Sequence, residues 1–185
     1  WVEALKISFL IATLIQLAFW LGLFSRLAFY RKGTPTTELQ PGVSVIICAH
    51  NEAENLRHYL PRLLEQDYEN FEVIVVDDQS IDNSMTILLE FQKKYPILRL
   101  VYESNKELPG KKGALSKGIL AAKNEILLLT DADCFPISSY WIKTMVAHYS
   151  AGAPIVLGYS PYQKENSWLS FFIQYETVYT ATQYF

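Results

Sequence analysis

Four short runs of aliphatic residues recur along the chain at nearly regular intervals. They are VSVIIC at 43–48, FEVIVV at 71–76, LRLVY at 98–102 and EILLLT at 125–130. Their starts lie about 27 residues apart, which leaves room for a helical crossover between parallel strands. The runs are β-branched and apolar on both faces, as expected of strands that helices cover on each side. The pattern predicts an α/β fold with an open, mostly parallel sheet.

Helical patterns fill the intervals between these runs. The first helix is expected to begin at Asn51, with Glu54 three residues later as in a capping box. Asp82 is expected to cap the second helix, whose residues Leu88 and Leu89 would face inward. The third helix is expected to pack closely through a small-residue face formed by Ala114, Leu115, Gly118, Ile119 and Ala122.

The chain begins with a long uncharged segment. From Ile7 to Ser25 no charged residue occurs in 19 positions, and such a helix spans roughly 28 Å, close to the hydrocarbon thickness of a bilayer. The alternative is a buried core helix, but few polar residues interrupt the run. A cleaved signal peptide is disfavoured because the run exceeds the usual roughly 7–15 residues. We therefore expect a transmembrane anchor and basic flank at 1–32, a linker at 33–42 and a globular domain at 43–185.

Charge and cysteine content narrow the class of protein. Sixteen basic residues against nineteen acidic ones give a net charge of -3, so the overall basic field of a nucleic-acid-binding protein is missing. Arg26, Arg31 and Lys32 follow the apolar segment, and the positive-inside bias then places the globular domain in the cytoplasm. Cys48 and Cys134 form no disulfide framework or metal-binding spacing and are expected to be reduced thiols.

Acidic residues follow three of the four predicted strands. The sequences at these strand ends are CAHNE, DDQSIDNS and DADC, and the loop after the third strand ends in PGKKGAL. Ligands of open α/β sheets bind beyond the carboxyl ends of the strands. Two carboxylates in one crevice repel each other unless a cation or a proton lies between them, so Asp131 and Asp133 indicate a metal ion. Together with Lys111 and Lys112, they suit a phosphorylated ligand.

Each of these features also has an ordinary structural explanation. Asp77 and Asp78 could end a strand and open a turn. Glu52 could be a first-turn acid that stabilises its helix dipole, and the lysine pair could belong to a solvated loop. Their occurrence together at the ends of successive strands favours a binding site.

Four segments together resemble a known enzyme family. VSVIICAHNEAENL, FEVIVVDDQSIDNS, GKKGAL and ILLLTDADC resemble, in this order, the motifs of the inverting family 2 glycosyltransferases, a family with processive polysaccharide synthases and many membrane-anchored bacterial enzymes. The resemblance implies a GT-A fold (the nucleotide-diphospho-sugar transferase fold), with helices on both faces of the sheet. It also implies a nucleotide-sugar donor, most often UDP-linked, an Mg²⁺ or Mn²⁺ ion and a saccharide or lipid-linked acceptor hydroxyl. The implied location is the bacterial inner membrane, with the catalytic domain in the cytoplasm.

The same resemblance implies roles for residues at the first two strand ends. Ala49, Glu52 and Asp77 would contact the nucleoside, and Asp78 would support the loop that holds it. His50 stands where the family frequently has a tyrosine. A loop histidine hydrogen-bonded to its neighbours is at least as good an interpretation of His50 as a base contact.

The remaining implied roles concern the phosphates and the metal. Lys111 would meet the diphosphate. Asp131 would lie on the ribose or sugar side of the donor and join Asp133 at the metal, where Asp133 would be the principal ligand. The ion would then stabilise a departing nucleoside diphosphate.

The family's catalytic base is an acidic residue on a helix well downstream of the metal motif. No matching motif occurs before Phe185, so we expect the base downstream of Phe185 and the chain to be a fragment with the donor half of the site. Such a fragment is expected to bind the donor without appreciable transfer. Glu176, on an expected amphipathic helix that would line the acceptor side, is the one candidate substitute.

Two other functions fit parts of the sequence. The run ILLLTDADCF is similar to the strand and aspartate pair of haloacid-dehalogenase-like phosphatases, but those enzymes place the pair on their first strand. A non-catalytic, membrane-tethered module that binds nucleotide-sugars would keep the same acidic residues. No Gly-x-Gly-x-x-Gly follows the first strand, which disfavours a dinucleotide-binding domain.

Overall fold

The computed structural model describes residues 1–29, 40–103, 110–149 and 155–182. It contains two compact units, one formed by Pro35–Val156 and the other by Trp1–Thr34 with Leu157–Phe185. Most of the predicted linker at 33–42 lies outside the described residues, and the predicted division into anchor, linker and catalytic domain stays a prediction.

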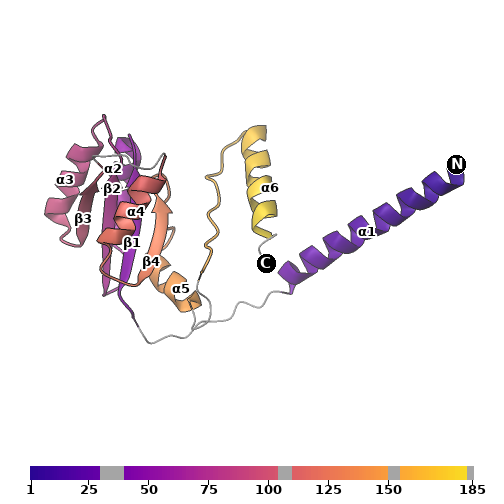
Figure 1. Cartoon of the computed structure of the whole chain (residues 1–185), viewed down its shortest axis with the longest axis horizontal. Helices are drawn as coiled ribbons and strands as arrows, with labels where there is room; N and C mark the ends of the chain where they lie inside the picture. Colours follow the sequence, from indigo (N-terminus) through magenta and orange to yellow (C-terminus); the bar gives the residue numbers. More distant parts are fainter. Residues whose placement is uncertain (30–39, 104–109, 150–154, 183–185) are drawn as a thin grey trace. The chain divides into compact units, whose positions relative to one another are not determined.

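The unit Pro35–Val156 is built on a four-stranded sheet (Figure 1). Strands β1 (Val43–Ala49), β2 (Phe71–Asp77), β3 (Leu98–Tyr102) and β4 (Ile126–Asp131) lie in the order β3-β2-β1-β4. All three neighbouring pairs are parallel. The predicted α/β fold with a parallel sheet is confirmed, and each predicted strand ends within one residue of the observed one.

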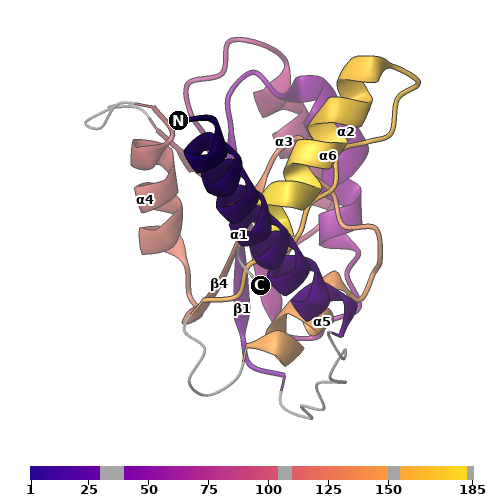
Figure 2. The same ribbon diagram turned by 90° about the vertical axis from the view of Figure 1, so that its right-hand side faces the viewer.

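Helices cover both faces of this sheet (Figures 1 and 2). Alternating residues of β2 show the division: Val73 and Val75 join the core that contains α2 (Ala53–Leu64), α3 (Ser84–Lys94) and α5 (Trp141–His148). Ile74 and Val76 instead pack with Ala114 of α4 (Lys112–Ala121). Both faces of the central strands β1 and β2 are buried, which explains why these strands lack a polar alternation, whereas the edge strands β3 and β4 are partly exposed.

Helix α4 approaches the sheet closely through a glycine. A Cβ atom at Gly118 would lie 2.5 Å from Cγ2 of Ile46 and 3.0 Å from Cγ2 of Val76, too close for a side chain. The small-residue face predicted for this helix is therefore confirmed at Ala114 and Gly118, both of which are buried. Ile119, predicted on the same face, is 41% exposed.

The predicted starts and faces of the other two helices need correction. Helix α2 begins at Ala53, and Asn51 lies before it with a φ of 58°, so the predicted capping box is wrong. Asp82 does stabilise the start of α3, because its Oδ1 accepts a hydrogen bond from the N–H of Ser84 at 2.9 Å. The inward face of α3 carries Leu88 as predicted, but Leu89 is 42% exposed.

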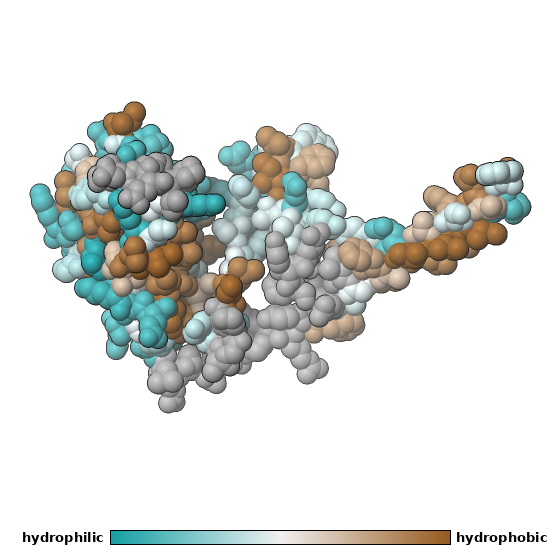
Figure 3. All heavy atoms as spheres, viewed as in Figure 1, coloured by the Kyte–Doolittle hydropathy of each residue, from teal (hydrophilic) through white to brown (hydrophobic). Residues whose placement is uncertain are grey.

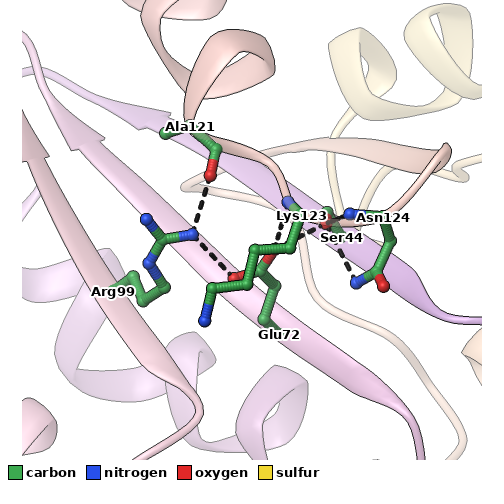
Figure 4. A network of polar contacts seen from close by, with 6 residues as sticks. All are labelled: Ser44, Glu72, Arg99, Ala121, Lys123 and Asn124. Atoms are coloured by element: carbon green, nitrogen blue, oxygen red, sulfur yellow. Dashed lines mark hydrogen bonds and ion pairs between the residues drawn. The ribbon is translucent and has the colours of Figure 1, made fainter.

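A polar network joins the amino ends of the strands, at the edge opposite the predicted crevice (Figure 4). Glu72 accepts hydrogen bonds from Ser44 Oγ at 2.8 Å, the Lys123 N–H at 2.7 Å and Arg99 Nη1 at 2.9 Å. Asn124 donates to Ser44 Oγ through its backbone and side chain. The buried carboxylate of Glu72 thereby connects the starts of all four strands, directly or through the turn that precedes the strand.

The other unit contains helices α1 (Val2–Ala28) and α6 (Trp168–Thr182). In α1, the segment Val2–Gly22 is long and apolar enough to cross a membrane, and none of it is buried. Figure 3 shows hydrophobic residues along this helix. The finding supports the predicted anchor by length and composition. Helix α6 confirms the helix predicted around Glu176, which is exposed.

Candidate functional site

A cleft of about 380 Å³ lies at the carboxyl ends of the strands. Its lining combines residues from the ends of β1 and β4, the loop after β2 and the start of α4. These residues are Cys48, Ala49, His50, Glu52, Asp78, Gly110, Lys111, Asp131, Ala132 and Asp133. The lining includes six of the seven predicted site residues, all except Asp77.

The strand register explains how residues distant in sequence meet here. Cys48 of β1 is paired with Asp131 of β4, and Ala49 of β1 is paired with Asp77 of β2. Because parallel strands end at one edge, each strand delivers the residues that follow it to the same crevice. The prediction of a single acidic crevice is confirmed for the first, second and fourth strand ends.

Two buried aspartates stand at the end of β2. Asp77 is 7% exposed and Asp78 is 6% exposed. Within the described residues, Oδ1 of Asp77 is buried and has no hydrogen-bond partner. A buried carboxylate oxygen without a partner is costly, and such groups in native proteins call for a specific explanation.

The end of β4 carries the candidate metal ligands. Asp131 is its last residue, and a tight turn follows in which the Cys134 N–H donates to the Asp131 carbonyl at 3.1 Å. One ligand atom each from Asp131, Asp133 and Cys134 lies within 4.8 Å of the other two. Both aspartates are exposed. Carboxylate oxygens suit hard cations such as Mg²⁺ and Mn²⁺, so the two aspartates fit the implied ion, whereas the soft sulfur of Cys134 does not.

Lys111 brings a positive charge to these carboxylates. It follows Gly110, whose φ of 67° lies in the left-handed region that favours glycine, and it directly precedes α4. Its Nζ forms an ion pair with Oδ1 of Asp131. Partial burial opposes the charge of Lys111, but the Asp131 carboxylate outweighs it and raises the lysine pKa above its ordinary value. Lys112 is exposed and is not among the described residues that line the cleft.

His50 is held by hydrogen bonds on both ring nitrogens. Nδ1 lies 2.6 Å from the Asp78 carbonyl oxygen, which can only accept, so Nδ1 carries the proton. Nε2 then accepts from the side-chain amide of Asn51 at 3.2 Å. The prediction of a loop histidine hydrogen-bonded to its neighbours is confirmed, and the same residue also lines the cleft.

Cys48 lines the cleft and is half-buried. Burial raises the pKa of its thiol, the carboxylates of Asp131 and Asp78 raise it further, and Lys111 opposes them. Cys48 is therefore a thiol at neutral pH. The pairing of β1 with β4 brings Cys48 beside Asp131, and Cys134 is not among the described residues that line the cleft.

Two further residues line the cleft, for which the family resemblance implies no role. Gly110 and Ala132 line it through backbone and small side chains. The signal for Gly110 was its position just before the lysine pair in PGKKGAL, where a left-handed backbone turns the chain into α4. Nothing in the sequence indicates a functional role for Ala132 except its position between the two aspartates.

Comparison with known proteins gives one consistent family. The family model described as glycosyl transferase family 2 matches residues 44–183. A poly-β-1,6-N-acetyl-D-glucosamine synthase of Staphylococcus epidermidis is 34% identical over 92 residues, which is 50% of this chain and 22% of the relative. Glycosyltransferase AglE of Haloferax volcanii is 33% identical over 124 residues, which is 66% of this chain and 40% of the relative. The chain therefore spans less than half of each relative.

A solved structure supports the same assignment. The mannosyltransferase PcManGT from Pyrobaculum calidifontis, in complex with GDP-Man and Mn²⁺, is 30% identical with a TM-score of 0.63. The match covers 71% of this chain and 39% of that one. These matches do not support the phosphatase or the non-catalytic binding module. The predicted GT-A fold and the family are confirmed: this chain belongs to glycosyl transferase family 2.

Proposed function

We propose that the cleft binds a nucleotide-sugar together with a divalent cation, as the donor site of an inverting glycosyltransferase. The observation that carries the proposal is the meeting of Asp131, Asp133 and Lys111 with Asp78 and Glu52 in one cleft. Carboxylates with a lysine beside them suit a diphosphate that a cation bridges. The roles of individual residues follow from where each side chain lies.

The acidic turn after β4 is assigned to the metal and the phosphates. Asp133 and Asp131 would hold Mg²⁺ or Mn²⁺, and when bound such an ion supplies charge stabilisation to the departing nucleoside diphosphate. Lys111 is placed to exchange its ion pair with Asp131 for an ionic contact with the diphosphate. The complex of PcManGT with GDP-Man and Mn²⁺ supports a divalent ion and a nucleotide-sugar at this site.

The ends of β1 and β2 are assigned to the nucleoside. Ala49, Glu52 and Asp78 line the cleft, so Asp78 takes the direct contact that the family resemblance had given to Asp77. Asp77 is buried beside it and is not among the described residues that line the cleft, so we assign it a supporting role behind Asp78. UDP is the expected carrier, and GDP is the alternative because PcManGT holds GDP-Man.

The acceptor and the place of action complete the proposal. The sugar would pass to a hydroxyl of a saccharide or lipid-linked acceptor at the inner face of a bacterial membrane, with α1 as the anchor. The relative from Staphylococcus epidermidis is a polysaccharide synthase, which supports such an acceptor. Inverting transfer also needs a general base within reach of that hydroxyl. The described cleft carboxylates are assigned to nucleotide and metal, so the base is sought downstream of Phe185.

Nucleotide titrations test the donor site. UDP and GDP are titrated into the 185-residue chain by calorimetry with Mn²⁺, with Mg²⁺ or with EDTA. We expect binding to require the cation, and Asp133→Asn to weaken nucleotide affinity by at least about tenfold, the equivalent of ~1.4 kcal/mol. The exposed acid Glu125, just before β4 and outside the cleft lining, supplies the control variant Glu125→Gln. Equal affinity with cation and with EDTA would reject the metal assignment.

A further inference from the structure

The loops after β1 and β2 are joined to each other by side chain–backbone hydrogen bonds. The Asn51 N–H donates to Ser80 Oγ at 2.9 Å, and the Ile81 N–H donates to Asn51 Oδ1 at 2.8 Å. The N–H of Asp78 also donates to the Ala49 carbonyl at 2.8 Å. These are the two loops that carry the proposed nucleoside contacts.

The start of α2 is capped by residues of the other loop. The Glu52 N–H donates to Ser84 Oγ at 3.0 Å, and the Ala53 N–H donates to Asp82 Oδ2 at 3.0 Å. The first N–H groups of a helix have no partner within it and are usually served by its own N-cap side chain. Here the Glu52 side chain instead accepts from Asn55 Nδ2 at 2.6 Å. The backbone position of Glu52 therefore depends on the loop after β2.

Asp82 connects the two helix starts. One carboxylate oxygen accepts from the Ala53 N–H of α2, and the other accepts from the Ser84 N–H of α3. Burial of the carboxylate is slight and opposes ionisation, but the donors of Ser84 and Ala53 outweigh it and lower the pKa of Asp82. Asp82 is exposed and is not among the described residues that line the cleft.

One residue in each loop has a positive φ. Asn51 and Gln79 have φ values of 58° and 59°, in the left-handed region, which asparagine tolerates better than most residues but which is unfavourable for glutamine. Such conformations persist only where surrounding contacts enforce them. In this chain the strained residues flank the cleft residues His50, Glu52 and Asp78.

We infer that Asp82 is a positioning residue, which fixes Glu52 relative to Asp78 and so assembles the nucleoside half of the donor site. This inference rests on the proposed function. It assigns Asp82 an indirect role in nucleotide affinity, with no contact to nucleotide or metal. The metal ligands stand at the end of β4, outside the two joined loops, so Asp82 should affect nucleoside binding without affecting binding of the metal alone.

Binding measurements on the whole chain test the inference. The affinity for UDP with Mn²⁺ and the affinity for Mn²⁺ alone are measured for wild type, Asp82→Ala and Asp82→Asn, at a temperature where each is folded. We expect Asp82→Ala to weaken UDP binding by about tenfold, the order expected when hydrogen bonds to a charged group are lost. Mn²⁺ affinity should stay within twofold. Hydrogen exchange should rise at the amides of Asn51, Glu52 and Ala53.

Glu72→Gln is the matched control for a purely structural effect. Glu72 holds a comparable polar network at the opposite edge of the sheet. Its substitution should lower the melting temperature without changing UDP affinity. UDP affinity unchanged in Asp82→Ala, or reduced to the same extent by Glu72→Gln, would overturn the positioning role. Failure of the wild type to bind any nucleotide would instead overturn the proposed function, and the inference with it.

Discussion

In the proposed function, Lys111 pairs with Asp131 when no donor is bound and with the diphosphate when the donor is bound. Both side chains are about half exposed, and exposed ion pairs typically contribute only ~0–1 kcal/mol to stability. Lys111 can therefore leave Asp131 at little cost when a diphosphate offers it a partner of higher charge. The raised pKa of Lys111 keeps it cationic across the physiological range.

Cys48 allows the occupancy of the cleft to be followed chemically. Cys48 lines the cleft, so a bound nucleotide should block reagents that reach its thiol through the opening. We expect UDP with Mn²⁺ to slow alkylation of Cys48 by iodoacetamide severalfold, measured by mass spectrometry of the labelled peptide. A Cys134→Ser background isolates the Cys48 signal. Identical labelling rates with and without nucleotide would contradict the placement of the donor in this cleft.

The sequence predicted most of the acidic residues that line the cleft, but it could not distinguish between the adjacent residues Asp77 and Asp78. Asp77 and Asp78 follow each other at the end of β2, where the strand alternation stops and the loop conformation decides which side chain faces the cleft. The positive φ of Gln79 and the bond from Asp78 N–H to the Ala49 carbonyl set that conformation. Neither is readable from residue types.

At the scale of elements, the strands were predictable and the helix starts were not. Aliphatic runs define a buried strand locally, and all four were found by pattern. The cap of α2 comes from Asp82 and Ser84, about 30 residues away in sequence. Propensity rules assign a helix cap to the residue next to the helix. The prediction of a capping box at Asn51 and Glu54 follows this local rule, which cannot find a cap supplied by side chains distant in the sequence. Asn51 instead uses its side chain to hold the neighbouring loop.

The Glu72 network should stabilise the sheet in a pH-dependent way. Burial opposes ionisation of Glu72, but hydrogen bonds from Arg99, the Lys123 N–H and Ser44 outweigh it and lower the pKa. We expect Glu72→Gln to reduce the free energy of unfolding by about 1–3 kcal/mol at pH 7, because the substitution removes acceptors from buried donors. Chemical denaturation with a circular-dichroism readout measures the loss.

The sign of the pH effect follows from the lowered pKa. The unfolded state titrates near the ordinary value of about 4.3, so the stabilisation by ionised Glu72 is complete above that pH. It is lost as the pH falls through the lower pKa of the folded state. The difference between wild type and Glu72→Gln should therefore shrink below about pH 4. A difference that stays constant down to about pH 3 would show that the charge of Glu72 contributes nothing.

At the scale of the whole molecule, the order of motifs along the chain carried more information than any single motif. An aspartate pair after a strand fits a phosphatase as well as a transferase. The chain order, with the pair on β4 beside β1 and the lysine loop just before α4, separates the two. The sheet topology therefore explains how motifs that lie apart in the sequence line a single cleft. The family match agrees with this order of motifs.

Helix α1 exposes many large apolar side chains, which leads to a prediction about the whole molecule. Leu10 and Leu14 are 61% and 57% exposed, and none of the segment Val2–Gly22 is buried. Apolar area left in water costs roughly 25 cal/mol per Å², so a bilayer around this segment would remove a large penalty. We expect the chain expressed in bacteria to remain in the membrane pellet after alkaline carbonate extraction. Leu10→Arg with Leu14→Arg should move it to the supernatant, because each arginine at a span centre costs about 2.5–3.5 kcal/mol.

The control for this prediction places the same charges elsewhere. Ile81 and Leu120 are 92% and 85% exposed in the sheet-containing unit, and the double variant Ile81→Arg with Leu120→Arg adds two arginines without touching α1. If α1 is the anchor, this variant stays in the pellet while the α1 variant leaves it. Release of both variants would show that net charge, rather than α1, governs the partition. Wild-type chain in the carbonate supernatant would contradict a membrane span altogether, and α1 would then need a protein partner to cover its apolar surface.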